Sequence, residues 1–239
     1  MLSGIIRFLP KHSGQGMKNL IRKGHSDDVF GETMHIRENV PKQEILAGRR
    51  VYLRPFGRDD LPYIEKWSND AELRRLTGEV APMSRAETEK WYKELLADKD
   101  RMWFAIVLKK GGRVIGEAGL LRMFRPWRNS DMTIIIGERD AWGKGYGTEA
   151  GHLLLDYAFR RLGFHRSSIG VVGFNKRALR FWESLGFKKE GVKRDEYYYD
   201  DEYSDGIMMS ILEDEYKKAP KDAVGKKQGI SKRASLQSI

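Results

Sequence analysis

Residues 134–150 read IIIGERDAWGKGYGTEA, and this stretch says most about the fold. An apolar, β-branched run ends in a glycine, a short charged turn follows, and a glycine-rich stretch then opens an amphipathic helix. This order presents unpaired backbone N–H groups at the positive end of a helix dipole. Because glycine lacks a Cβ, ligand oxygens approach such amides closely. The pattern predicts a phosphate-binding cradle that consists of Trp142, Gly143, Lys144, Gly145, Tyr146, Gly147 and Thr148.

The glycine spacing differs from two common nucleotide-binding motifs. A dinucleotide-binding turn reads G-x-G-x-x-G and is followed by an acidic residue about 20 positions later. Here the spacing is G-x-G-x-G, and the next expected strand, residues 167–172, contains no acid. The P-loop pattern G-x-x-x-x-G-K-S/T is also absent from the sequence. For the glycines taken alone, a tight turn with residues at positive φ remains the alternative.

Residues 175–191 read NKRALRFWESLGFKKEG and predict a second amphipathic helix. Gly186 is placed to end this helix as a C-cap residue, and a strand follows from Phe187. The apolar residues that recur at helical spacing are Ala178, Phe181, Trp182 and Leu185.

Together the two segments resemble the GCN5-related N-acetyltransferase family. That family carries Gln/Arg-x-x-Gly-x-Gly/Ala at the start of a helix and later Asn-x-x-Ala-x-x-x-Tyr/Phe-x-x-x-Gly-Phe. The second motif is matched closely from Asn175 to Phe187, and Gly145 and Gly147 match the glycines of the first. Trp142 stands where Gln or Arg is usual, as in the branch that acetylates protein N-termini and polyamines. The resemblance covers about residues 50–216.

This resemblance implies an α/β (α+β) fold of the acyl-CoA N-acyltransferase type, with a mixed, twisted central sheet flanked by helices. It implies direct transfer of acetyl from acetyl-CoA to a primary amine, which is either a protein N-terminal α-amine or a polyamine. A non-catalytic acyl-CoA-binding regulator is the alternative, and nucleic-acid binding through the chain ends is a further hypothesis.

In the resembled family, the strand before the cradle is partly unpaired, and its backbone binds the pantetheine arm as an added strand would. The resemblance assigns this role to the backbone of Ile134, Ile135 and Ile136, one of whose N–H groups would polarise the thioester carbonyl. The alternative is a plain core strand. Asn175 is either a helix N-cap or a hydrogen-bond partner of pantetheine. Arg180 either contacts a phosphate or is an exposed helix arginine.

Trp182 is the main catalytic departure from the family, because many relatives have there a tyrosine that protonates the departing thiolate. An indole N–H donates a hydrogen bond but is no practical acid near neutral pH. Another group then protonates the sulfur, or the thiolate leaves unassisted. The candidates by residue type are Tyr146, Tyr197, Tyr198 and Tyr199.

A carboxylate is the expected base that removes a proton from the attacking amine. Glu117 interrupts an apolar strand and Asp131 begins the strand before the cradle, so both are candidates, with surface ion pairs as the alternative. Further acids gather around the last expected hairpin, where they steer a cationic acceptor or simply form a charged turn. These acids are Asp195, Glu196, Asp200, Asp201, Glu202 and Asp205.

Composition divides the 239 residues into three parts: an N-terminal extension (1–48), the acetyltransferase-like domain (49–216) and a basic C-terminal tail (217–239). Of the net charge of +10, +4 falls on residues 1–50, +6 on residues 217–239 and none on the remainder. We expect both ends to be mobile, with contact to nucleic acid or the ribosome as the alternative.

Some classes of site are excluded or disfavoured by the sequence. The chain has no cysteine, which excludes disulfides and thiolate metal sites and fits a cytoplasmic protein. Its five histidines show no metal-ligand spacing, so we expect no metal site. No apolar run reaches the ~20 residues that span a bilayer. The acceptor's identity and the oligomeric state, a homodimer included, stay open.

Hydrophobic periodicity and turn residues place the secondary structure. Helices are expected at residues 59–69, 84–97, 147–162 and 178–185, with a capping box of Ser84 and Glu87. Strands are expected at residues 51–54, 102–108, 114–121, 131–136, 166–172, 188–199 and 202–212.

Overall fold

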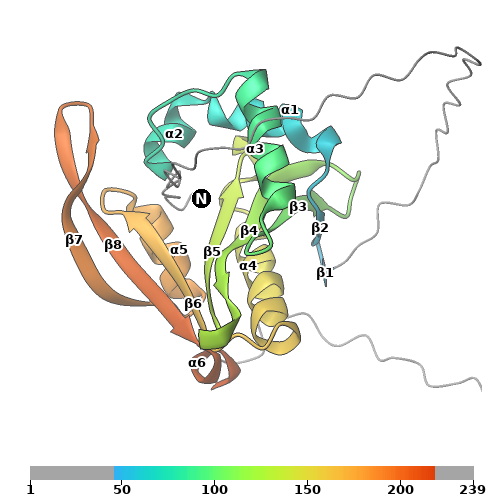
Figure 1. Ribbon diagram of the computed structural model, residues 1–239, viewed down its shortest axis with the longest axis vertical. Helices are drawn as coiled ribbons and strands as arrows, with labels where there is room; N and C mark the ends of the chain where they lie inside the picture. The colour runs from blue at the N-terminus through green and yellow to red at the C-terminus, as the bar shows by residue number, and fades with distance from the viewer. Residues whose placement is uncertain (1–45, 219–239) are drawn as a thin grey trace, which may run out of the picture. The chain divides into compact units, whose positions relative to one another are not determined.

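The computed structural model describes residues 46–218, which form an eight-stranded sheet with helices on both faces (Figure 1). The strand order is β1-β2-β3-β4-β5-β6-β8-β7. The strands are β1 (Leu46–Ala47), β2 (Val51–Pro55), β3 (Met102–Leu108), β4 (Val114–Phe124), β5 (Asn129–Ile136), β6 (Arg166–Val172), β7 (Lys188–Tyr199) and β8 (Glu202–Leu212). The α-helices are α1 (Leu61–Ser68), α2 (Ala71–Thr77), α3 (Arg85–Ala97), α4 (Tyr146–Asp156), α5 (Lys176–Ser184) and α6 (Glu213–Lys218). Short 3-10 turns are η1 (Arg58–Asp60), η2 (Arg125–Trp127) and η3 (Arg139–Ala141), and the π-helical turn η4 (Tyr157–Arg161) follows α4.

Apolar alternation along the strands produces two cores. In β5, Ile134 and Ile136 belong to the core beneath α4 and α5, whereas Ile135 belongs to the core beneath α1, α2 and α3. Successive side chains of a strand point to opposite faces, so one strand supplies both cores. The sheet therefore has an α4–α5 face and an α1–α3 face.

The sheet opens between β5 and β6, its one parallel pair among the described strands. Pairing there is limited to three partners, from Asn129 with Arg166 to Asp131 with Ser168. Beyond Asp131 the two strands diverge, as Figure 1 shows. We call β1 to β5 the first arm and β6 to β8 the second arm of this opening. The mixed sheet flanked by helices confirms the predicted fold class.

Local signals account for several helix ends. The capping box of Ser84 and Glu87 is present at the start of α3, and Gly186 follows α5 with φ at 95°. Three details differ from expectation. Helix α2 was not predicted, the helix expected at residues 147–162 becomes a π-helical turn after Asp156, and β1 lies inside the predicted N-terminal extension. Residues 1–45 of that extension, and all but the first two residues of the predicted C-terminal tail, lie outside the described residues.

Two expected absences concern the described part of the chain alone. Between residues 46 and 218, no helix is long and apolar enough to cross a membrane. Within the same residues, no group of three or more His, Asp or Glu side chains is placed to hold a metal ion.

Candidate active site

The predicted cradle lies between the end of β5 and the start of α4. Gly143 and Gly145 have φ values of 71° and 76°, and Gly145 is the N-cap of α4. A Cβ on Gly143 would meet nothing within 4 Å, so the approach to the loop is open. Among the described residues, none accepts a hydrogen bond from the amides of residues 143–148. The loop therefore presents free donors at a helix N-terminus, as phosphate binding requires.

A strap from the β1–β2 turn holds the cradle. Glu149 accepts hydrogen bonds from the backbone N–H of Arg50 (2.6 Å) and Val51 (3.3 Å) and from Nε of Arg50 (3.0 Å). Arg50 Nη1 then donates to the carbonyl of Lys144 (2.9 Å), and the guanidinium lies 5.1 Å from the centre of the Tyr146 ring. We call the Arg50–Glu149 pair the loop strap. Burial alone would raise the pKa of Glu149, but these hydrogen bonds outweigh burial and lower it.

Trp142 braces the cradle against the end of β5. Its Nε1 donates to the carbonyl of Ile136 at 2.6 Å. Arg177 lies 4.7 Å from the centre of the indole ring, and Arg139 lies at 5.9 Å. Trp142 therefore fixes the loop from within the protein. Arg177, which the sequence analysis did not single out, is the α5 arginine beside the cradle.

The backbone from Ile134 to Ile136 forms the open edge of the first arm. These residues pair with Gly116 and its neighbours on β4, but none pairs with β6. The carbonyl of Ile135 lies against Gly116, where a Cβ would clash with it. Because both backbone groups of a strand residue point to the same side, those of Ile134 and Ile136 point into the opening. Trp142 takes one lone pair of the Ile136 carbonyl. The backbone groups of Ile135 face β4, so the sequence-based assignment of all three residues to the ligand is corrected to Ile134 and Ile136.

Asn175 and Arg180 occupy different environments. Asn175 is buried and caps α5, with its oxygen accepting from the N–H of Ala178 (2.9 Å). Its amide nitrogen donates to the carbonyl of Leu76 in α2 (2.9 Å). Arg180 is exposed, and no side-chain hydrogen bond or ion pair joins it to another described residue. The structure therefore adopts the N-cap alternative for Asn175.

Helix α2 bridges the two arms. At its start, Arg139 forms an ion pair with Asp70 (2.7 Å) and thereby connects α2 to the loop that leads to the cradle. At its end, Leu76 accepts the bond from Asn175 of the second arm. Arg75 of the same helix lies 4.6 Å from the centre of the Phe174 ring. The opening is thus spanned on the α1–α3 face by a seven-residue helix held at both ends.

Trp182 is fully buried in the core beneath α4 and α5. Its ring packs against Phe181 and Phe187 at centroid distances of 5.0 and 4.9 Å. The indole N–H is buried and has no hydrogen-bond partner among the described residues. Since an unpaired buried donor is costly, it is a feature that a bound ligand can satisfy.

The two predicted bases lie on different strands and at different levels of the sheet. Glu117 is buried on the α1–α3 face opposite Ile135, and its Oε2 accepts a 2.6 Å bond from Nε1 of Trp103. Asp131 lies at the last β5–β6 pair and forms an ion pair with Arg122. Asp131 and Ile135 are four positions apart along the strand, which corresponds to about 13 Å. The two carboxylates therefore do not act on one atom, and Glu117 is the one level with the open edge, one strand further in.

The four candidate tyrosines differ in burial and in the partners of their hydroxyl groups. Tyr146 lies beneath Arg50, and Tyr198 is exposed with its hydroxyl donating to Asp201 (2.9 Å). The hydroxyl of Tyr197 is buried without a partner among the described residues. Burial is the main reason that the pKa of Tyr197 rises to about 12. Tyr199 is half-buried near the hairpin end.

The acidic residues expected around the last hairpin also have different partners. The backbone of Asp195 donates to Asp205, and Asp200 pairs with Arg75 at 3.7 Å. Glu196 pairs with Lys193 at 2.6 Å, while Glu202 is exposed. Much of this cluster is thus a charged turn, which is one of the two interpretations that the sequence allowed.

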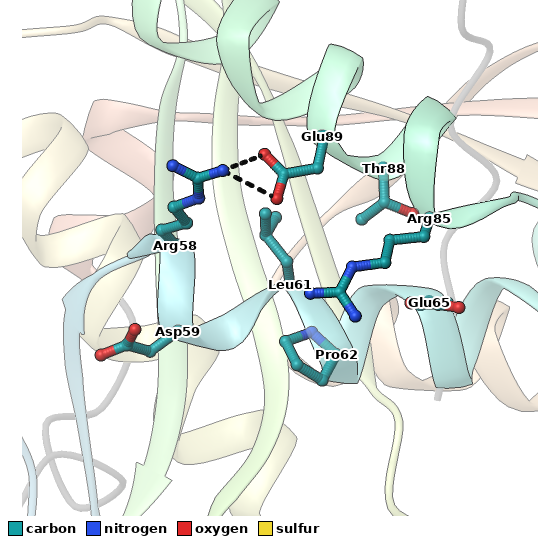
Figure 2. A pocket seen from close by; sticks show the side chains of 8 residues that line it. All are labelled: Arg58, Asp59, Leu61, Pro62, Glu65, Arg85, Thr88 and Glu89. Atoms are coloured by element: carbon teal, nitrogen blue, oxygen red, sulfur yellow. Dashed lines mark hydrogen bonds and ion pairs between the residues drawn. The ribbon is translucent and has the colours of Figure 1, made fainter.

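A separate pocket of about 420 Å³ lies between the η1–α1 segment and α3, as Figure 2 shows. Arg58 reaches across it to both carboxylate oxygens of Glu89, at 3.1 and 3.0 Å. Its lining consists of Arg58, Asp59, Leu61, Pro62, Glu65, Arg85, Thr88 and Glu89. It contains none of the predicted site residues, so the candidate site is defined by the opening in the sheet and the cradle.

Comparison with known proteins identifies the family. The acetyltransferase (GNAT) domain family matches residues 50–188, which is more than half of the chain. The chain belongs to the GNAT acetyltransferase family. It is 29% identical to the spermidine N(1)-acetyltransferase of Escherichia coli (strain K12) over 170 residues, covering 71% of this chain and 90% of that protein. It is 32% identical to a probable N-acetyltransferase, YjcK, of Bacillus subtilis (strain 168), covering 70% and 97%.

A solved structure of this family is also similar. The spermidine N-acetyltransferase from Vibrio cholerae in complex with CoA and spermine superposes with a TM-score of 0.66 at 27% identity. The match covers 70% of this chain and 98% of that one. As a GNAT protein the chain is an acetyl-CoA-dependent N-acetyltransferase. The comparisons give no support to the alternative of a non-catalytic acyl-CoA-binding protein.

Proposed function

We propose that this GNAT enzyme acetylates a primary amine of a polyamine, with the β5–β6 opening as the site of transfer. The observation that carries the proposal is that both backbone groups of Ile134 and the N–H of Ile136 face the opening, next to a cradle of free amides. A pantetheine arm fits this edge as an added strand, and its pyrophosphate fits the cradle. The polyamine acceptor is supported by the names of the relatives from E. coli and V. cholerae.

In the proposed reaction, the amine nitrogen attacks the thioester carbonyl, the C–S bond breaks and an amide forms. Glu117 receives the proton that the nitrogen loses, directly or through one water. An N–H group of Ile134 or Ile136 stabilises the negative charge on the carbonyl oxygen, which is worth on the order of 3 kcal/mol. Trp182 donates a hydrogen bond to the leaving sulfur but no proton.

The cradle test compares two glycines of similar backbone conformation. Gly145→Val is expected to abolish the rise in melting temperature that acetyl-CoA causes, since Val is strained at φ 76° and faces Arg50 at 3.2 Å. Gly163→Val is the control, because Gly163 also has positive φ (70°) but lies beyond α4. If Gly145→Val binds acetyl-CoA as the wild type does, the cradle assignment is wrong.

The acceptor test compares spermidine with short peptides that have free N-termini. Turnover of spermidine alone supports the polyamine proposal, whereas turnover of peptides alone replaces it with N-terminal acetylation. Acetyl-CoA binding without turnover of either class would overturn the proposed acceptors.

A further inference from the structure

Two consecutive residues of β7, Glu196 and Tyr197, lie on the same face of the sheet. Neighbouring residues in a regular strand face opposite ways. Here the β7–β8 register shifts between Lys193 and Tyr197, and Asp195 has φ at 52°, so the alternation is broken by a bulge. The bulge lies in the second arm, beside the end of β6.

Contacts of both side chains place them on the α1–α3 face. A Cβ on Gly78, at the end of α2, would lie 2.5 Å from Cε1 of Tyr197 and 3.2 Å from Cγ2 of Val172. The Glu196 carboxylate lies over Gly206, where a Cβ would clash with it. Gly206 is the cross-strand partner of Val172, so both positions face the same way. Glu196 and Tyr197 therefore lie beneath the end of the bridging helix α2.

Each of these side chains holds a buried polar atom without a partner among the described residues. The two atoms are Oε2 of Glu196 and the hydroxyl oxygen of Tyr197. The other carboxylate oxygen of Glu196 accepts from Nζ of Lys193 at 2.6 Å. The negative charges of Glu196 and Glu79 add to burial in raising the pKa of Tyr197, so both carboxylates lie near the phenol. An unsatisfied buried acceptor is costly, and a donor ligand removes that cost.

We propose that Glu196 and Tyr197 form a subsite for a second, distal ammonium group of the acceptor. This inference rests on the proposed function and names the chemistry that selects the acceptor. An ammonium carries three donors and no acceptor, which complements two unpaired oxygens near a negative charge. A peptide bond at this place would offer one N–H and a carbonyl oxygen facing the carboxylate. The subsite thus favours a polyamine over a peptide N-terminus.

The test compares two amines that share a primary amino group and differ in charge. Spermidine has distal ammonium groups and n-butylamine has none. Glu196→Gln is expected to lower kcat/KM for spermidine about tenfold and to leave the value for n-butylamine unchanged. The matched control, Glu202→Gln, removes the same charge from an exposed position of the same hairpin and is expected to alter neither value. Equal loss with both amines, or no loss with spermidine, overturns the subsite.

A second pair of variants separates ligand binding from a structural role. Lys193→Met frees one oxygen of Glu196 and removes a competing cation, so it is expected to raise kcat/KM for spermidine several-fold. A structural salt bridge would instead make loss of Lys193 harmful, as loss of Glu196 is. Tyr197→Phe is expected to lower kcat/KM for spermidine alone, with exposed Tyr203→Phe as its control. If the wild type acetylates neither amine, the proposed function itself fails; if it acetylates both and the variants do not discriminate, only the subsite fails.

Discussion

Glu149→Gln is expected to weaken acetyl-CoA binding without touching the cradle itself. In the wild type, Glu149 accepts three N–H donors from Arg50 and Val51. Hydrogen bonds to a charged group are worth about 1.5–3 kcal/mol each. The Arg50 side chain is 41% exposed, so its share is reduced by solvent, and Gln retains one acceptor oxygen. We expect a loss of about 1.4 kcal/mol in cofactor binding, which corresponds to about tenfold in Kd.

The assay uses two cosubstrates that differ in the part that the cradle binds. Acetyl-CoA carries the pyrophosphate, and acetyl-pantetheine lacks it. Glu149→Gln should raise the Kd for acetyl-CoA while leaving kcat/KM for acetyl-pantetheine at the wild-type value. Arg58→Ala is the control, because it breaks an ion pair with Glu89 in the separate pocket. An equal loss with both cosubstrates would refute the reasoning, since the loop strap would then support the whole site.

Three further predictions follow from single contacts. Glu117→Gln is expected to reduce kcat at least about tenfold with unchanged acetyl-CoA affinity; a wild-type rate would exclude it as the base. Trp182→Phe should lower kcat more than KM if the indole donates to the sulfur, whereas equal rates with a lower melting temperature would leave it a core residue only. The hydrogen bonds from Arg166 lower the pKa of Glu190 from 4.5 to about 2. Glu190 therefore stabilises the fold fully above about pH 4.5 and loses this contribution as the pH falls through about 2, so Glu190→Gln should flatten acid unfolding in that range.

Local chemistry made much of the fold predictable. Strands such as Met102–Leu108 are bounded by turn residues, and the Ser84 capping box and Gly186 C-cap are short-range devices. Helix α2 was not predicted, because it is seven residues long and largely polar. The local signals of its two ends are Asp70, which caps its N-terminus, and Gly78, which follows it at φ 75°.

The site was less predictable, because its supports come from distant segments. Arg50 and Glu149 are 99 positions apart, so no local sequence pattern predicts the loop strap that they form. On α5, Arg177 and not Arg180 lies beside Trp142, which depends on how the helix is rotated against the sheet. The Asn175 side chain bonds both α5 and α2, and the second bond required knowledge of a helix that the pattern did not predict.

Two kinds of chemical group face the two substrates at the proposed site between β5 and β6. In the proposed site, the cofactor is bound mainly by main-chain groups, which every amino acid carries, whereas the acceptor is bound and deprotonated by side chains, Glu196 and Glu117. Substitution of these side chains is therefore expected to change which amine is acetylated without changing the binding of acetyl-CoA. A protein of this design can drift far in sequence and still keep its cosubstrate, provided that the strand divergence and the glycines of the loop persist.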